Sequence, residues 1–155
     1  MRRRETPWPS GRPRSTALPE KGWRDLASRR FLEIRSYRLK PGTAEEFDRL
    51  VTEASVPMLR RRGIDVVAFG RSLEDDGDHY LMRAYASLED LERSESDFYG
   101  SERWRLGPRD AIIACIENYT SVVIEIDDGT LEGLRDISGE DPRSESRPTG
   151  PNGSG

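Results

Sequence analysis

The stretch FLEIRSYRLKPG, residues 31–42, combines an alternating run of side chains with a strong turn signal. Glu33, Arg35 and Tyr37 fall at every second position, and Leu32 and Ile34 occupy alternate positions on the other face. This period of two is typical of a β-strand, and Lys40-Pro41-Gly42 marks the turn that ends it. Because a tyrosine on such a face needs cover and a hydrogen-bond partner, we expect this face to be enclosed rather than simply solvated.

Residues 44–59 have the apolar pattern of an amphipathic helix. The apolar side chains recur at steps of three and four residues: Ala44, Phe47, Leu50, Val51, Ala54, Met58 and Leu59. Such a stripe packs against a sheet, so we expect Phe47 and Leu50 to be buried together with Ile34 of the first strand. Pro57 is expected to kink this helix or to separate its last turn, because proline has no N–H to donate.

The remaining elements follow in the order strand, strand, helix, strand. Residues 64–73 and 80–86 are predicted strands, and the Asp75-Asp76-Gly77-Asp78 turn between them predicts a hairpin. Ser87, followed three residues later by an aspartate, begins the second helix. Residues 119–126 are rich in β-branched side chains and are predicted to form the closing strand. The residues of the second helix that are expected to face the core are Leu88, Leu91 and Phe98.

The order strand, helix, strand, strand, helix, strand predicts an α+β, ferredoxin-like βαββαβ domain. In this arrangement a four-stranded antiparallel sheet carries its helices on one face. We expect the domain to occupy residues 31–126, between a basic leader (residues 1–30) and an acidic tail (residues 127–155), both of disordered composition. Within the tail, only a weak helical turn is indicated, by Leu131, Leu134 and Ile137.

Charge is unevenly distributed along the 155 residues. The leader carries nine basic and three acidic groups, whereas residues 31–126 carry thirteen basic and nineteen acidic groups. Phosphate binding needs clustered positive charge, so the acidic balance of the domain argues against nucleic acid as its main partner. The basic leader leaves a tethering role open, in which it docks on an acidic surface.

The composition offers few residues of the kinds that hold a cofactor. The chain has one histidine, one cysteine and no glycine-rich loop that cradles phosphate, so we expect no tightly bound metal, flavin, haem or nucleotide. The single cysteine excludes an internal disulfide and favours a reducing, cytoplasmic location. We expect no transmembrane segment, because no apolar run approaches the roughly 20 residues that span a bilayer.

His79 and Cys115 have simple structural interpretations. His79 adjoins the aspartate-rich turn and is expected to be a hairpin residue, with a role as a lone acid or base as the alternative. Cys115 lies among aliphatic residues and is expected to be a small buried hydrophobe. The aspartates of the turn lack the spacing and the closing glutamate of a calcium loop.

Five residues with polar or charged groups form the more informative set: Glu33, Arg35, Tyr37, Arg83 and Tyr85. If a second subunit encloses the sheet face that carries them, their charges must pair and their hydroxyls must find partners. An ion-pair network at a homodimer interface is the first interpretation. A polar ligand site is the second.

Two further residues keep two interpretations each. Trp104 follows a helix break at Gly100, and it is expected either to pack in the core or to wall a pocket between sheet and helices. Arg71 joins the polar set only if the register of the second strand against the third places it there.

Several short motifs occur in an order that resembles the NIPSNAP family, part of the dimeric α+β barrel superfamily. The matching stretches are residues 33–37 and 39–42, residues 57–61 with Gly63, residues 84–88, and Trp104 with the aliphatic last strand. The resemblance covers residues 31–126. It implies a homodimer in which two sheets face each other across a two-fold axis, each with its helices outside.

The sequence favours a dimeric barrel that binds a small apolar or aromatic molecule, or a protein partner, without chemistry. The resemblance implies no mechanism, because the family's bacterial members look like small proteins of undefined biochemistry. Related barrels include cofactor-free monooxygenases, which makes an oxygenase acting on a phenolic or quinol-like substrate the alternative. The candidates for a catalytic role in that alternative are Arg35, Tyr37, His79, Arg83, Tyr85 and Trp104.

Overall fold

The computed structural model describes residues 29–135 and residue 137. Its elements, in chain order, are β1 (Arg29–Leu39), α2 (Ala44–Leu50), the π-helical turn η1 (Val51–Ser55), α3 (Val56–Arg61), β2 (Asp65–Arg71), β3 (Asp78–Tyr85), α4 (Leu88–Gly100), α5 (Glu102–Leu106), α6 (Arg109–Cys115), β4 (Ile116–Asp127) and α7 (Asp128–Arg135). Most of the expected leader, on which the tethering hypothesis rests, and residues 138–155 of the expected tail lie outside the described residues.

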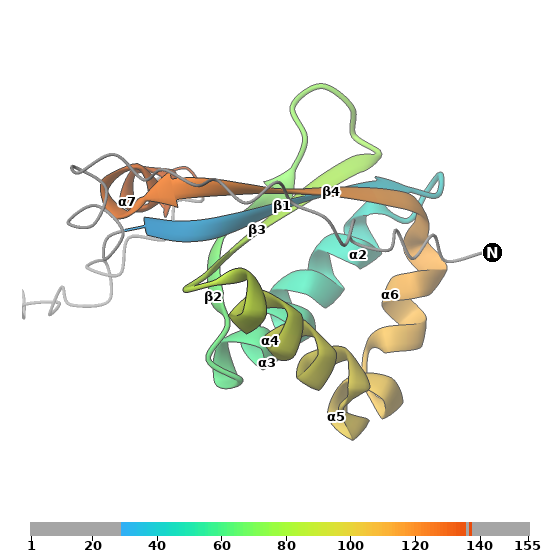
Figure 1. The fold of residues 1–155 in the computed structure, drawn as a ribbon. Coiled ribbons are helices and arrows are strands. Elements are labelled where there is room, and N and C mark those ends of the chain that lie inside the picture. Colours follow the sequence, from blue (N-terminus) through green and yellow to red (C-terminus); the bar gives the residue numbers. More distant parts are fainter. Residues whose placement is uncertain (1–28, 136, 138–155) are drawn as a thin grey trace, which may run out of the picture.

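The four strands form one antiparallel sheet in the order β2-β3-β1-β4. The first strand, β1, therefore lies in the middle of the sheet, between β3 and the closing strand β4 (Figure 1). The two edge strands are β2 and β4. This order and these directions confirm the predicted ferredoxin-like βαββαβ fold class.

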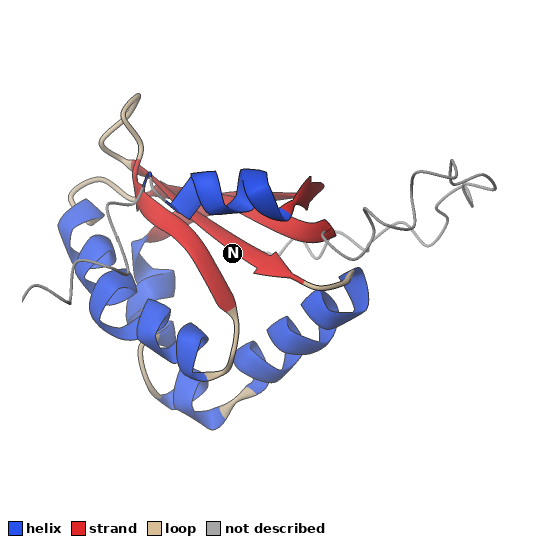
Figure 2. Ribbon diagram, turned by 90° about the vertical axis from the view of Figure 1, so that its left-hand side faces the viewer, coloured by secondary structure: helices blue, strands red, loops and turns tan. Residues whose placement is uncertain are grey.

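Helices α2 to α6 form a layer on one face of the sheet, whereas α7 lies on the opposite face (Figures 1 and 2). The sequence assigned residues 128–135 to a disordered tail with one weak turn, and this assignment is wrong. These residues form a helix that packs on the sheet, because Leu131 is buried against side chains of the strands. In the described part of the chain, no helix is long and apolar enough to cross a membrane.

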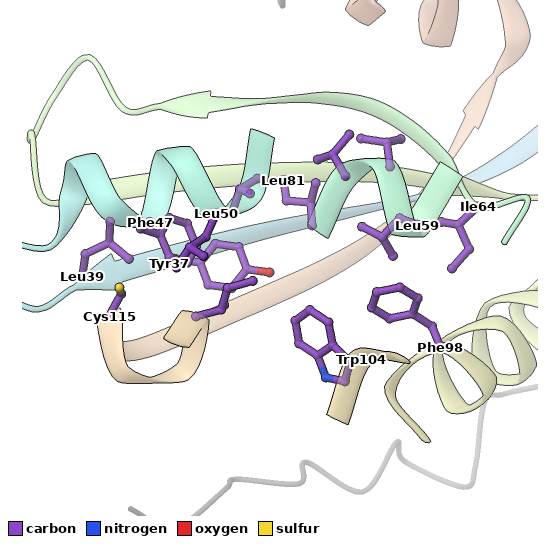
Figure 3. Packing of buried hydrophobic residues seen from close by; sticks show 14 of the residues in the cluster. Tyr37, Leu39, Phe47, Leu50, Leu59, Ile64, Leu81, Phe98, Trp104 and Cys115 are labelled. Carbon is purple, nitrogen blue, oxygen red and sulfur yellow. The ribbon is translucent and has the colours of Figure 1, made fainter. Parts of the chain in front are cut away.

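The main core lies between the sheet and the helix layer (Figure 3). Tyr37, Phe47 and Leu50 are buried there together, and the ring centres of Tyr37 and Phe47 are 5.2 Å apart. Ile34, which was expected in this core, instead packs on the other face of the sheet. The reason is the alternation of a strand: once Tyr37 points towards the helices, every even-numbered side chain of this part of β1 points away from them.

A second, smaller cluster of buried apolar residues lies under α7. Leu131 of α7 packs there with Leu32 of β1. Arg135, at the end of α7, donates to both carboxylate oxygens of Asp65 at 2.7 Å. The two-pronged contact joins the last turn of α7 to the start of β2, so α7 covers only this part of the sheet face.

The helix predicted over residues 44–59 is divided by a π-helical turn. η1 separates α2 from α3, and Pro57 lies in the first turn of α3. Proline has no N–H to offer to a carbonyl of the preceding turn, and a π-helical turn is a common way to accommodate such a missing bond. The predicted interruption at Pro57 is therefore confirmed.

Candidate functional site

Two buried charged residues face each other on the central strands. The register of β1 against β3 places Glu33 opposite Arg83, and Arg35 lies two residues along β1 on the same face. The Arg83 side chain is fully buried, and the Glu33 side chain is 3% exposed. Since a buried charge is costly unless it is paired and hydrogen-bonded, both residues depend on nearby partners.

Glu33 is the common acceptor for two guanidinium groups. Arg83 donates to its Oε2 through Nη2 and Nε, at 2.6 and 3.0 Å. Arg35 donates to its Oε1 through Nη2 and Nε, at 2.7 and 3.1 Å. Each carboxylate oxygen therefore accepts two charge-assisted hydrogen bonds, which are the stronger kind.

Helix α4 completes this group of side chains from the other side. Glu95 Oε1 accepts from Arg83 Nη2 at 2.7 Å. The Tyr99 hydroxyl, one helical turn further on, accepts from Nη1 of Arg83 at 2.9 Å and from Nη1 of Arg35 at 3.0 Å. We call Glu33, Arg35, Arg83, Glu95 and Tyr99 the arginine–glutamate cluster.

The two carboxyl groups of the cluster titrate in opposite directions. Burial disfavours the ionised form of Glu33, but the charge of Arg83, a hydrogen bond with Glu95 and the charge of Arg35 outweigh it and lower its pKa to about 2. Burial and the hydrogen bond with Glu33 raise the pKa of Glu95 to about 7, although the charge of Arg83 opposes this. Glu33 is therefore ionised at neutral pH, whereas Glu95 is protonated in part of the molecules and ionised in the rest.

The net charge of the cluster follows the proton on Glu95. Both arginines stay charged at any physiological pH. With Glu33 ionised and Glu95 protonated, two positive charges face one negative charge, a net charge of +1. An anion near the guanidinium groups is attracted most strongly in this form, and its presence in turn favours the proton on Glu95.

Arg35 forms the outer rim of the cluster, next to the closing strand β4. Its guanidinium carbon is 5.1 Å from the centre of the Tyr119 ring and 5.8 Å from that of Tyr99, distances at which cation–π attraction operates. The Arg35 side chain is 12% exposed, and Tyr119 is 46% exposed. The rim therefore presents a cation beside two phenol rings, one of which is open to solvent.

Tyr85 and Tyr37, both named from the sequence, lie at the margins of the cluster. The Tyr85 hydroxyl donates to Glu95 Oε1 at 3.4 Å, and burial raises the pKa of Tyr85 although the charge of Arg83 opposes it. The Tyr37 ring is 6.0 Å from that of Tyr119, and burial raises the pKa of Tyr37 to about 12 although the charge of Arg35 opposes it. Both phenols are therefore neutral at physiological pH.

Trp104 supports the cluster from the helix layer. It is buried in the main core, and its ring packs edge-on against Tyr99 with the centres 5.4 Å apart. The centre of its ring is also 5.1 Å from that of Phe98, which itself packs against Tyr99. Trp104 thus fixes the ring whose hydroxyl binds both arginines, which agrees with the interpretation as a core residue.

His79 and Arg71 do not belong to the cluster. The buried His79 ring packs edge-on against Phe47, and its Nε2 lies 3.2 Å from Asp48 Oδ1. Burial lowers the pKa of His79, although the hydrogen bond with Asp48 opposes this. Arg71 lies opposite His79 in the hairpin and 3.9 Å from Asp48. His79 and Arg71 thus hold the β2–β3 hairpin against α2.

The polar set of β1 and β3 lies between the sheet and the helices, not on the face that helices leave open. The first interpretation, an ion-pair network enclosed by a second subunit, is therefore wrong, because α4 of the same chain encloses it. The residues that sequence reasoning missed are Glu95 and Tyr99. A signal for Glu95 existed: it falls four residues after Leu91 and three before Phe98, on the core-facing stripe of α4.

The described fold is similar to solved structures of NIPSNAP proteins. A NIPSNAP family protein from Agrobacterium tumefaciens strain C58 is 20% identical, over 64% of this chain and 87% of that chain, with a TM-score of 0.59. A NIPSNAP family protein of unknown function from the same strain is 21% identical, over 63% and 88% of the two chains, with a TM-score of 0.58. An uncharacterized NIPSNAP-like domain protein from Burkholderia xenovorans is 18% identical, over 61% and 83%, with a TM-score of 0.57.

The sequence matches no family model and no curated protein. The likeness to the solved structures extends over most of their length at low sequence identity. It confirms the resemblance at the level of the fold: this chain has the fold of NIPSNAP family structures.

Proposed function

We propose that this protein is a NIPSNAP-type homodimer that binds a small, weakly anionic aromatic molecule at the rim of the arginine–glutamate cluster. The observation that carries the proposal is the environment of Arg35. Glu33 fixes its guanidinium group, which lies beside the rings of Tyr99 and Tyr119. A phenolate or an aromatic carboxylate suits such a site, since its ring packs on tyrosine while its anionic oxygen accepts from arginine.

The charge of the cluster supports an anion rather than a cation as the ligand. With Glu95 protonated, the cluster has a net positive charge, and within the described residues no further carboxylate hydrogen-bonded to it balances this charge. An anion at Arg35 neutralises this charge without breaking the bonds between Arg35 and Glu33, because the arginine side chain has five N–H donors. We therefore take the exposed edge of Arg35 as the anchor of the ligand.

The open part of the sheet face supports the homodimer. Val122 and Ile124 of β4 expose 54% and 42% of their surface, opposite Ile34 and Leu32 in the register of β1 and β4. These side chains share the face that carries α7, beyond the part that α7 covers. A contiguous apolar sheet face of this kind is a typical interaction surface, and a second copy of the same face is its self-complementary partner.

A titration with 4-nitrophenol tests the ligand proposal. The bound phenolate should give a saturable absorbance change, and Arg35→Gln should weaken binding by about tenfold or more, as expected for loss of a charged hydrogen bond. Tyr119→Ser changes a ring that is 46% exposed, so it should weaken binding with little effect on the fold. Arg38→Gln is the matched control, because Arg38 lies on the same strand and pairs with Asp78 away from the cluster. Binding that is equal in all four proteins contradicts the proposal.

A second candidate function, cofactor-free chemistry on a phenolic substrate, is favoured by Glu95. A carboxyl group whose pKa burial raises to about 7 is suited to accept a proton at neutral pH. Arg83, which donates to Glu95, and Arg35 then stabilise a developing phenolate. Oxygen consumption with a panel of hydroquinones tests this candidate. Turnover that Glu95→Gln abolishes, while 4-nitrophenol still binds, would make the protein an enzyme; no turnover leaves binding as its function.

A further inference from the structure

A cavity that is separate from the arginine–glutamate cluster opens where the end of α3 meets the end of α4 and the start of α5. Its volume is about 230 Å³, below the roughly 300–1,000 Å³ of pockets for drug-sized ligands. The residues that line it are Met58, Arg61, Arg62, Phe98, Ser101 and Arg103. Three of the six lining residues are arginines, and none is acidic.

The three arginines of this cavity belong to the minority of described arginines that lack a carboxylate partner. Most arginines pair with a carboxylate, as Arg49 does with Glu46 at 2.7 Å. Within residues 29–135 and 137, by contrast, no hydrogen bond or ion pair engages the guanidinium groups of Arg61, Arg62 or Arg103. Their fifteen N–H donors, five on each side chain, therefore have no acceptor within this part of the chain.

Three unpaired positive charges around a small cavity create a positive potential that concentrates anions. Arg61 and Arg62 are at the end of α3, where positive charge suits the helix dipole, but Arg103 belongs to another helix, α5. Guanidinium groups that converge from two elements are well suited to bind phosphate. Each planar guanidinium group can donate two parallel hydrogen bonds to two phosphate oxygens. A dianionic phosphate also balances three cations better than a monocarboxylate does.

The cavity also has an apolar wall. Phe98 is 1% exposed and Met58 is half-buried, and both line the cavity. Ser101 is held in place, since its hydroxyl donates to the Phe98 carbonyl at 2.7 Å and accepts from the Trp104 N–H at 3.4 Å. An inorganic ion leaves this wall without a partner, whereas an organic group attached to the phosphate covers it.

We infer that the cavity between α3, α4 and α5 binds a small organic phosphate monoester. Its phosphate group lies among Arg61, Arg62 and Arg103, and its short apolar group lies against Phe98 and Met58. The inference is independent of the proposed function, because no residue of the arginine–glutamate cluster lines this cavity.

Calorimetric titration of the full chain with butyl phosphate tests the inference. Butyl phosphate has no ring for the tyrosines at Arg35, so Arg35→Gln should bind it as the wild type does. Arg62→Gln and Arg103→Gln should each weaken binding by about tenfold, as expected for loss of a charge-assisted hydrogen bond. Arg105→Gln is the matched control, because Arg105 is on the same helix as Arg103 but does not line the cavity. Inorganic phosphate should bind more weakly than butyl phosphate.

A lipid headgroup offers the same chemistry as a soluble ester, and co-sedimentation with vesicles of phosphatidylcholine and phosphatidic acid distinguishes the two sources. Vesicle binding that requires Arg103, without binding of butyl phosphate, assigns the phosphate monoester to a lipid. Binding of butyl phosphate that requires Arg103 assigns it to a soluble molecule. Binding of neither probe, or an equal loss in Arg105→Gln, overturns the inference. Thermal midpoints of Arg62→Gln, Arg103→Gln and Arg105→Gln should equal that of the wild type, because these three side chains are exposed.

Discussion

Glu33 is the residue on which both buried guanidinium groups depend, since each donates two hydrogen bonds to its carboxylate. Glu33→Gln removes the negative charge and leaves Arg35 and Arg83 with too few acceptors in a region of low dielectric constant. We expect the free energy of unfolding to fall by about 3–5 kcal/mol, the usual effect of removing one partner from a buried ion pair. Urea denaturation measures this loss.

The control for Glu33→Gln is Glu46→Gln. Glu46 also pairs with an arginine, Arg49, at 2.7 Å, but both side chains of that pair are about half exposed. Surface ion pairs contribute little to stability, so the urea midpoint of Glu46→Gln should equal that of the wild type. Equal midpoints for Glu33→Gln and Glu46→Gln would show that the buried cluster does not stabilise the fold.

The opposite pKa shifts of Glu33 and Glu95 predict a pH optimum of stability. The pKa of Glu33 falls from its ordinary value of 4.5 to about 2, so its contribution is present above pH 4.5 and is lost as the pH falls through about 2. The pKa of Glu95 rises from 4.5 to about 7, so its contribution is complete below pH 4.5 and is lost as the pH rises through about 7. Together Glu33 and Glu95 should make the fold most stable at about pH 5.

Glu95→Gln isolates the upper side of this optimum. Glutamine still accepts a hydrogen bond from Arg83 but does not titrate, so the wild type should lose stability relative to the variant between about pH 5 and about pH 8. The lowered pKa of His79 acts in the opposite sense, because its contribution grows as the pH rises through 6.5. That contribution is the same in both proteins and cancels in the difference. Thermal midpoints at a series of pH values give the comparison, and a difference that does not vary with pH contradicts the role of Glu95.

Among the elements, the helices and turns were the easier part to predict from the sequence. Ser87 caps α4 as expected, with its Oγ accepting from the Asp90 N–H at 3.0 Å, and Ser101 caps α5 in the same way. Such signals are local: the side chain that ends or begins a helix bonds to a backbone group within a few residues. Sequence reasoning therefore finds them without knowledge of the tertiary structure.

The direction in which β1 faces was the part that the sequence did not reveal. The alternation of side chains along β1 shows which residues share a face of the sheet, but not which face the helices cover. The face with aliphatic residues is usually the one that packs in the core. Here the helix-covered face carries Glu33 and Arg35, because α4 supplies Glu95 and Tyr99 as partners far away in the sequence. Arg35 and Arg83 could therefore be named as candidate site residues from the sequence. Their surroundings were assigned wrongly, because the face that carries them was expected to lie away from the helices.

The packing of α2 against the sheet gives a prediction at the scale of the element. Leu50 is buried in the main core beside Phe47, so Leu50→Ala should leave a cavity and lower the free energy of unfolding by about 2–5 kcal/mol. Leu106→Ala is the control, because Leu106 is almost fully exposed at the end of α5. Chemical denaturation compares the two variants, and an unchanged midpoint for Leu50→Ala would show that α2 does not pack through this residue.

At the scale of the whole molecule, the two faces of the sheet have different roles. The face under α2 to α6 holds the arginine–glutamate cluster and the main core. The opposite face carries aliphatic residues in its middle, such as Ile34 and Val122, and α7 covers it near the start of β2 and the end of β4. From the sequence, tyrosines and arginines were expected on the open face, at the homodimer interface. The structure places aliphatic residues on the open face instead, so the proposed homodimer would associate through hydrophobic burial rather than ion pairing.

Association through this face predicts that light scattering at micromolar concentration gives twice the mass of one 17.6 kDa chain. Val122→Asp places a charge in the middle of the open face, opposite Ile34 of β1. A carboxylate buried without a partner in an apolar interface is strongly unfavourable, so this variant should have the mass of one chain and an unchanged far-ultraviolet circular dichroism spectrum. Leu73→Asp is the matched control, because Leu73 is fully exposed in the β2–β3 hairpin loop and outside the sheet, and it should remain a dimer. A wild-type mass of one chain contradicts the homodimer, and a dimer that survives Val122→Asp contradicts this face as its interface.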